Sequence, residues 1–292
     1  MPSLKFHHVD VFSNKPYRGN SIPVFYDAPD LDAVQLLEIT REMRHFEAIF
    51  LQPTGTQGEF ATRVFDMFEE LDFAGHPLIG SAATLTHLYG PPPGGEWILR
   101  LGDRKVRIET REEDGTFAAL LDAGEPAIFD YGGDSAEVAA AFSLDLDSLD
   151  VSLPLQVAST GLRYLVVPVK PGQIAAGRVA FDLTQMLHAQ NAQFAILFDP
   201  EAREIRHWNN DGVIEDIATG SAAGAVASYC VLHGLAPPGE IFRVSQGRFV
   251  GRPTSIDVRV DRRGDGRLSA MIGGAATVLG HGELYFAPEP KS

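Results

Sequence analysis

The stretch from Phe73 to Gly80 combines residue types that could bind an anion and move a proton. Gly75 lets the backbone turn tightly and approach a ligand, and Pro77 suits the first turn of a helix, where its missing N–H is not needed. The first amide groups of a helix point outward and favour an anion. His76 would lie at this helix end, where the dipole disfavours its cationic form. A neutral imidazole there can relay a proton, and a histidine that caps or packs fits equally well.

The stretch from Asp216 to Ser221 has a similar composition. Asp216 could accept a proton or orient a substrate amine. Gly220 and Ser221 could donate hydrogen bonds to a carboxylate. Ordinary capping of a helix by the aspartate or the serine is the alternative.

Glu47 is the third candidate group. It is the one charged residue in the run from Phe46 to Leu51, where strand geometry puts it on one face with Ile49 and Leu51. The carboxylate is therefore expected to be partly buried, and desolvation would raise its pKa toward the range that suits acid–base catalysis. The alternative is a glutamate at a strand end that reaches solvent or pairs with Arg44.

A shift of 144 positions lays the two glycine stretches on each other without a gap. It matches Asp72 with Asp216, Ala74 with Ala218, Gly80 with Gly224, Ala83 with Ala227, Leu88 with Leu232 and Gly90 with Gly234. Chance identities among common residues are the alternative to a duplication. Small residues along a helix suit one that strands enclose closely. We therefore expect a duplicated α+β unit with antiparallel strands around each helix, and two helix N-termini facing one cleft.

Hydrophobic periodicity and turn residues predict the elements around these stretches. Helices are expected from Asp30 or Asp32 to about Arg44, at 75–90, 136–142, 182–190 and 222–233. Strands are expected at 6–12, 22–26, 46–51, 60–68, 97–101, 105–110, 116–121, 156–158, 162–169, 194–198, 204–208, 241–245, 255–260, 268–272 and 277–286. Gly273 and Gly274 fall between the last two, where a bulge or turn is expected. The acidic segment 124–154 is the best place for a domain boundary.

Composition limits the class of protein. The formal charge of −15 argues against binding to nucleic acid or an anionic membrane surface, because basic patches attract both. Cys230 is the single cysteine, so an intramolecular disulfide and a cysteine-rich metal site are ruled out. His7, His8 and Glu42 have no metal-ligand spacing, and no metal site is expected. The chain lacks a signal-peptide core and any run of about 18 apolar residues, so we expect a cytoplasmic protein.

Several segments together resemble one known family. They are Phe65-x4-Glu70-Leu71-x-Phe73-Ala74-Gly75-His76-Pro77, Gly212-Val213-x-Glu215-Asp216-x-Ala218-Thr219-Gly220-Ser221-Ala222, Val9-Asp10-Val11-Phe12, Gly19-Asn20, Arg41-Glu42-Met43 and Ile272-Gly273-Gly274-Ala275-Ala276. By these segments the chain resembles the PhzF (phenazine biosynthesis) family over nearly its full length.

The resemblance implies the diaminopimelate epimerase-like fold. This is an α+β fold of two pseudo-symmetric halves, each a strongly curved, mostly antiparallel sheet around a central helix, with the active site in the cleft between them. The N-terminal half is expected to cover residues 1–122 plus 279–292, and the C-terminal half residues 123–278. Family members are often homodimers.

The resemblance also implies a chemistry. The family works without cofactor or metal, and its best-understood member isomerises trans-2,3-dihydro-3-hydroxyanthranilate by proton transfer. By motif, Glu47 resembles the acid–base residue, with His76 and Asp216 as its polar partners. The positions that bind the substrate, chiefly its carboxylate, are matched by Gly75, Gly220 and Ser221.

The chain also departs from the family pattern. Phe46 stands where a serine is common, and Asp66, Met67, Asp72 and Ile217 replace the usual Thr, Pro, Pro and Pro. The leading hypothesis is a cofactor-independent isomerase of a small carboxylate substrate that uses Glu47. The alternatives are a non-catalytic small-acid-binding protein on the same fold and a structural role through dimerisation. The related two-thiol racemases need a cysteine at each glycine turn, and Gly75 and Thr219 occupy those positions here.

Overall fold

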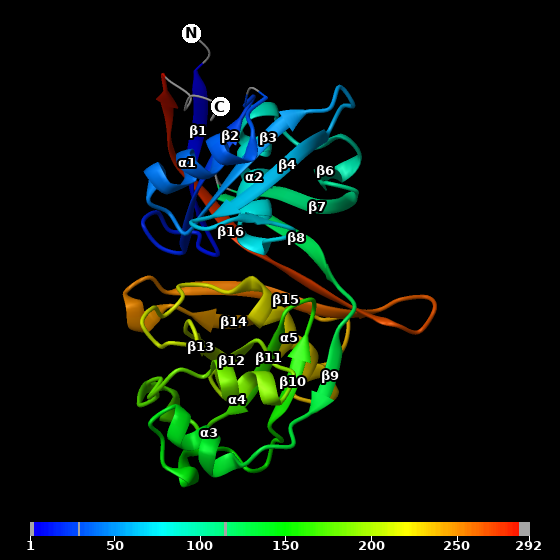
Figure 1. The fold of residues 1–292 in the computed structure, drawn as a ribbon. Coiled ribbons are helices and arrows are strands. Elements are labelled where there is room, and N and C mark those ends of the chain that lie inside the picture. The colour runs from blue at the N-terminus through cyan, green and yellow to red at the C-terminus, as the bar shows by residue number, and fades with distance from the viewer. Residues whose placement is uncertain (1–2, 29, 114–115, 286–292) are drawn as a thin grey trace. The chain divides into compact units, whose positions relative to one another are not determined.

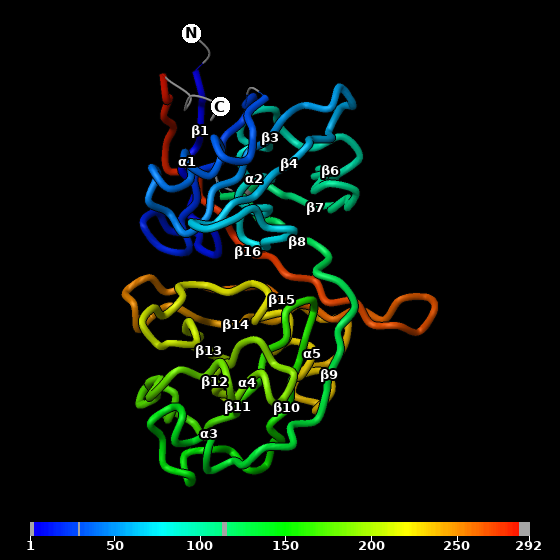
Figure 2. The backbone as a smooth tube through the Cα atoms, in the orientation of Figure 1, coloured from blue at the N-terminus to red at the C-terminus, as the bar shows by residue number. Residues whose placement is uncertain are grey.

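The computed structural model describes residues 3–28, 30–113 and 116–285. The chain forms two compact units (Figures 1 and 2). One unit contains the chain up to Asp122 and again from Gly273, and the other is Ala123–Ile272. The sequence predicts the return to the first unit at residue 279, whereas the structural division falls at Gly273, inside a strand.

The first unit is a sheet that closes on itself around one helix. Its elements are β1 (Leu4–Val11), β2 (Asn20–Tyr26), α1 (Ala33–Met43), β3 (Glu47–Pro53), β4 (Glu59–Asp66), β5 (Glu70–Leu71), α2 (Gly75–Tyr89), β6 (Glu96–Leu101), β7 (Arg104–Glu113), β8 (Thr116–Gly124) and the later part of β16 (Leu268–Leu284). The strand order is β1-β2-β3-β4-β6-β7-β8-β16, and β16 also pairs with β1. The pairs β2–β3 and β4–β6 are parallel. Figure 2 follows the C-terminal strand back to the N-terminal one.

The second unit also has a mostly antiparallel sheet around one helix. Its elements are β9 (Ala127–Asp130), α3 (Ser135–Ala141), β10 (Gln156–Ser159), β11 (Arg163–Pro168), the 3-10 turn η3 (Gln173–Ala175), α4 (Thr184–Ala189), β12 (Phe194–Asp199), β13 (Glu204–His207), α5 (Gly220–Leu232), β14 (Phe242–Gln246), β15 (Thr254–Arg262) and the start of β16. The strand order is β16-β15-β14-β13-β12-β11-β10-β9, with β11–β12 and β13–β14 parallel. The mostly antiparallel α+β class that the sequence predicts is confirmed.

Each unit encloses one helix of small residues. In the first, α2 packs against β1, β2, β3 and β7 and is buried from His76 through Thr86. In the second, α5 packs against β9, β10, β11 and β15 and is buried from Ala222 through Cys230. The enclosed helices predicted from composition are therefore present, and each is followed by a glycine with positive φ, Gly90 or Gly234.

Glycine allows the sheets to approach these helices. A Cβ on Gly80 would lie 2.9 Å from Ile22 Cγ2 and 3.2 Å from Val11 Cγ2. A Cβ on Gly224 would lie 3.1 Å from Thr160 Oγ1 and 3.2 Å from Ile272 Cγ2. The two glycines that the sequence shift matches thus have the same packing role.

The expected break near the C-terminus is wrong. The predicted strands 268–272 and 277–286 form one strand, β16, that runs through Gly273 and Gly274; the end expected at residue 286 lies outside the described residues. A Cβ on Gly273 would lie 2.0 Å from the Ala119 carbonyl oxygen. Gly273 therefore permits close passage of a neighbouring strand, and the strand continues without the turn that was one of the two expectations.

We predict that Gly80→Ala destabilises the protein although alanine normally favours a helix. The added methyl group must displace Ile22 or Val11, so the free energy of unfolding should fall by about 1 to 3 kcal/mol. Chemical denaturation measures the change. Gly280→Ala is the control, because its Cβ would meet nothing within 4 Å. Equal stability of the two variants would contradict the packing role of Gly80.

Candidate active site

The first unit brings Glu47 and His76 together. Helix α1 ends at Arg44, which has left-handed backbone geometry, and β3 then begins at Glu47 opposite Asp66 of β4. The carboxylate Oε2 of Glu47 lies 3.3 Å from Nδ1 of His76. The two side chains are 20% and 10% exposed. The partly buried carboxylate that the strand pattern predicts at Glu47 is therefore present, and it contacts an imidazole that is also mostly buried.

His76 is the second residue of α2, and Gly75 is the first. The N-cap residue is Ala74, whose methyl group cannot accept a hydrogen bond from the first amides of the helix. An outside acceptor, such as a carboxylate, is suited to these amides and to the positive end of the dipole. The Glu47–His76 pair thus lies at the N-terminus of a helix that has no side-chain cap.

The second unit places Asp216 ahead of α5, with Gly220 and Ser221 as the first two residues of the helix. The N-cap residue is Thr219, which makes no capping hydrogen bond with its side chain. Its hydroxyl instead donates to Oδ2 of Asp216 at 2.5 Å. The hydroxyl of Ser221 lies 2.7 Å from that of Tyr164. The capping role considered for Asp216 and Ser221 is therefore not the one they have.

Gln246 fixes the backbone around Asp216. Its side-chain amide donates to the Asp216 carbonyl and to the Thr219 hydroxyl, both at 3.0 Å, and its Oε1 accepts from the Thr219 amide at 2.9 Å. The Asp216 amide donates to the His207 carbonyl at 2.9 Å. The carboxylate of Asp216 is thus held on a segment whose backbone is bonded on both sides.

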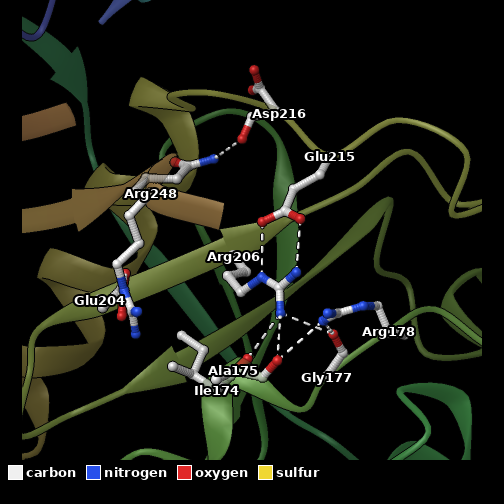
Figure 3. Close-up of polar contacts among 10 residues, drawn as sticks. Ile174, Ala175, Gly177, Arg178, Glu204, Arg206, Glu215, Asp216 and Arg248 are labelled. Carbon is white, nitrogen blue, oxygen red and sulfur yellow. Dashed lines mark hydrogen bonds and ion pairs between the residues drawn. The ribbon is translucent and has the colours of Figure 1, made fainter. Parts of the chain in front are cut away.

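Glu215, next to Asp216, forms an ion pair with a buried arginine (Figure 3). Arg206 donates from Nε to Oε1 of Glu215 at 2.8 Å and from Nη2 to Oε2 at 2.7 Å. Its Nη1 donates to the carbonyls of Ile174 and Gly177 at 3.0 and 2.9 Å. Arg206 is 2% exposed in its side chain, and every nitrogen of the guanidinium has a partner.

His207 is a buried imidazole on β13 whose Nδ1 lies 3.1 Å from the Ala195 carbonyl oxygen. Burial lowers its pKa below the ordinary value of 6.5, against the opposing effects of the Asp216 carboxylate and the Ala195 carbonyl. His207 is therefore neutral, with Nδ1 as the donor to Ala195. An uncharged ring beside Asp216 keeps that carboxylate from forming an ion pair with it.

Sequence reasoning missed Arg206, Gln246, Tyr164 and His207. Glu215 falls inside the motif quoted above, but nothing in its spacing assigned it a partner. Strand pairing supplies the missing signal, because Glu215 bridges to Trp208, two residues after Arg206.

Cys230 lies in the buried middle of α5, and burial raises the pKa of its thiol to about 12. A thiol with that pKa stays protonated near neutral pH, so Cys230 is not suited to act as a thiolate base.

Two further searches cover the part of the chain that the structure describes. Within residues 3–28, 30–113 and 116–285, His, Cys, Asp and Glu side chains form no cluster that could hold a metal ion. Among the same residues, no helix has the length and hydropathy needed to cross a membrane.

Comparisons with known proteins agree with this architecture. A family model described as phenazine biosynthesis-like protein matches residues 9–282. The trans-2,3-dihydro-3-hydroxyanthranilate isomerase of Pseudomonas chlororaphis is 29% identical over 95% of this chain and 99% of its own. An uncharacterized isomerase of Escherichia coli O157:H7, YddE, is 30% identical over 95% of this chain and 97% of its own. The structure of a predicted epimerase from Pseudomonas aeruginosa matches with a TM-score of 0.87 and 40% identity, covering 97% of this chain and all of that one.

Two pseudo-symmetric α+β units, each with a helix enclosed by its sheet, define a fold shared with epimerases and isomerases. The chain belongs to the phenazine biosynthesis-like (PhzC-PhzF) family and is an isomerase of that family. The family that the sequence motifs predict is confirmed.

We predict that His207 makes the protein less stable in acid. Below pH 6.5 the unfolded chain protonates this histidine while the folded chain keeps it neutral, so the free energy of unfolding falls as the pH falls. His207→Asn can keep a donor to Ala195 but cannot titrate, and its stability should fall less steeply between pH 7 and 5. Denaturant titrations at several pH values measure the slope. His188→Asn, at an exposed position of α4, is the control; equal slopes in all three proteins would contradict the assignment.

Proposed function

We propose that the protein is a cofactor-independent isomerase that moves a proton between two carbons of a small carboxylate substrate. Glu47 is the acid–base residue in this proposal, and His76 and Asp216 are its polar partners. The single observation that carries it is the Glu47–His76 contact of 3.3 Å beside the N-terminus of α2. This contact is not an ion pair on the protein surface, because both side chains are largely buried.

The proton balance of the reaction is simple. The Glu47 carboxylate takes a proton from a carbon that the substrate carboxylate or a conjugated double bond acidifies, and the electron pair moves into the conjugated system. The same carboxyl group then returns a proton to a different carbon, so the composition of the substrate is unchanged. His76, whose Nδ1 faces Glu47, can hydrogen-bond the carboxylate before the first step and after the second.

In this proposal the N-termini of α2 and α5 bind the substrate. The backbone amides of Gly75, Gly220 and Ser221 are donors of the kind that hold a carboxylate. Asp216 can accept a hydrogen bond from a substrate amine, and the Thr219 hydroxyl, which donates to its Oδ2, helps to orient the carboxylate. The acid–base steps use these side chains and amides alone, which agrees with the cofactor-free chemistry that the family resemblance implies.

The substrate class follows from the relatives together with these donors. Relatives that align over nearly the whole chain are named as isomerases of trans-2,3-dihydro-3-hydroxyanthranilate, an amino- and hydroxy-substituted carboxylate. We include that acid and similar amino or hydroxy acids in the proposal. The exposed Phe46, 48% accessible and next to Glu47, adds an apolar surface at this position. The isomerase names of the relatives favour catalysis over the non-catalytic acid-binding alternative.

The cytoplasmic location expected from the sequence and the homodimer implied by the resemblance belong to the same proposal. Sedimentation equilibrium of the purified protein tests the dimer: a mass near twice 31.7 kDa supports it, and 31.7 kDa contradicts it.

We predict that Glu47→Gln abolishes proton transfer but not binding. Glutamine keeps the size of the side chain and cannot take up the proton, so solvent deuterium should enter the substrate at least about a hundredfold more slowly. Incorporation in deuterated water, followed by NMR with trans-2,3-dihydro-3-hydroxyanthranilate and a panel of small amino and hydroxy acids, measures the rate. Calorimetry with the same acids measures binding.

Glu59→Gln is the matched control for this experiment. Glu59 is a buried glutamate of the same unit, on β4, that lies near Arg100 and Lys105 at 3.4 and 3.5 Å. Deuterium incorporation should survive in this variant. If deuterium incorporation is unchanged in Glu47→Gln, or is lost equally in both variants, Glu47 is not the acid–base residue.

A further inference from the structure

The ion pair between Arg206 and Glu215 has a counterpart in the first unit. Arg63 donates from Nε to Oε1 of Glu70 at 2.7 Å and from Nη2 to Oε2 at 2.6 Å, through the same atoms as the Arg206 pair. In both arginines the third nitrogen, Nη1, donates to the backbone. The Nη1 of Arg63 donates to the Leu31 carbonyl. The Nη1 of Arg206 donates to the carbonyls of Ile174 and Gly177. We call each of these pairs a clamp.

The strand pairing around the two clamps is also the same. Glu70 pairs with Phe65 of β4, and Glu215 pairs with Trp208 directly after β13. Each arginine stands two residues before that aromatic partner and therefore on the same face of its strand. Each guanidinium also lies over the aromatic ring, at 5.2 Å for Phe65 and 4.4 Å for Trp208. The two clamps thus use the same atoms, lie at the same strand register and make the same contact with an aromatic ring, so the two units repeat one arrangement.

The distance along the chain from each clamp to its helix is identical. Gly75 follows Glu70, and Gly220 follows Glu215, by the same number of residues, and both glycines are the first residue of a helix. This correspondence needs a shift of 145 positions rather than the ungapped 144 that matches Gly80 with Gly224. Asp216 therefore corresponds to Leu71 and not to Asp72.

We infer that the two clamps are positioning devices for the site, and that Arg206 is a positioning residue for Asp216. This inference rests on the proposed function for its catalytic consequence. The bidentate pair fixes Glu215 in distance and rotation. The backbone of Asp216 is then held between Glu215 on one side and Gln246, which donates to the Asp216 carbonyl, on the other. The hydroxyl of Thr219 donates to its carboxylate. In the first unit the Arg63 clamp holds the segment that leads into His76.

The two clamps differ in burial, and this predicts a difference in effect. Arg206 and Glu215 have side chains 2% and 11% exposed, against 35% and 41% for Arg63 and Glu70. Water and salt screen an exposed pair, whereas a buried pair keeps its orienting strength. Loss of the Arg206 clamp should therefore disturb its segment more than loss of the Arg63 clamp.

The first test uses Arg206→Lys, which keeps the positive charge and loses the planar two-point fork. Hydrogen–deuterium exchange of the amides in segment 213–221 should become about tenfold faster or more, the size expected for one lost charged hydrogen bond. Segment 70–76 should be unchanged in this variant. Arg63→Lys should give the reverse pattern with a smaller increase. Unchanged exchange of segment 213–221 in Arg206→Lys would overturn the inference, and this readout needs no substrate.

A second variant separates positioning from stability. Arg206→Met with Glu215→Leu removes both charges, a change that often leaves a buried pair site as stable as before. Arg178 still donates to the carbonyls of Gly177 and Ala175. With trans-2,3-dihydro-3-hydroxyanthranilate, kcat should fall by about tenfold to a hundredfold, as expected for a displaced reacting group, while KM changes less and the melting temperature is kept. The same kcat as the unaltered protein would overturn the inference.

Arg243→Met with Asp257→Leu is the control double variant. This pair links β14 and β15 at 3.0 Å, with Arg243 mostly exposed, and neither residue belongs to the segment of Asp216. Its kcat and its exchange in segment 213–221 should match those of the unaltered protein. Failure of the proposed function is distinguishable: Asp216→Asn would then leave turnover unchanged, or turnover of the acid would be absent, while the exchange result for the clamp would still stand.

Discussion

The close fit of a curved sheet around a central helix is the constraint on which the rest of this structure depends. The strands approach α2 and α5 so nearly that a single methyl group at Gly80 would meet Ile22 at 2.9 Å. Glycine at the closest contacts lets each helix lie there, and each is buried over an unbroken run of residues, so neither shows the polar face of a surface helix. The enclosed helix is then fixed along its length by the strands around it. Its first turn becomes a rigid position from which amide groups can hold an anion.

The segments that lead into each enclosed helix are themselves partly buried. Those segments carry charged side chains, which are costly to bury unless they are paired. Arg206 meets this demand with two bonds to Glu215 and others to backbone carbonyls, in a side chain that is almost fully buried. The same atoms that satisfy its charge also fix the residue next to Asp216. In the second unit one interaction thus pairs a buried charge and also holds the segment next to Asp216, and the first unit has a more exposed version of it between Arg63 and Glu70.

Much of the fold could be predicted from the sequence because its signals are local. The sequence places the start of α1 at Asp30 or Asp32, and Asp32 is the N-cap; the small residues of α2 and α5 predict enclosure. The continuous strand β16 could not be predicted, since two glycines that normally mark a break here let Ala119 pass close by. The clamps also escaped prediction: each joins residues on two paired segments, and the differing loop lengths put them out of the 144-residue register. The contact between Glu47 and His76 depends on how β3 lies against α2, which spacing along the chain does not contain.

The central claim is that Glu47 moves a proton on an acid whose carboxylate is held by the helix termini. The most direct measurement is a crystal structure of the Glu47→Gln variant with trans-2,3-dihydro-3-hydroxyanthranilate bound. The account predicts the substrate carboxylate within hydrogen-bond distance of backbone amides at Gly75, Gly220 or Ser221. It also predicts that the substrate carbon that exchanges its proton lies within about 3.5 Å of the terminal atoms of the side chain at position 47, the separation needed for proton transfer. A bound acid whose carboxylate is held by other residues, or whose exchanging carbon lies far from position 47, would contradict the account.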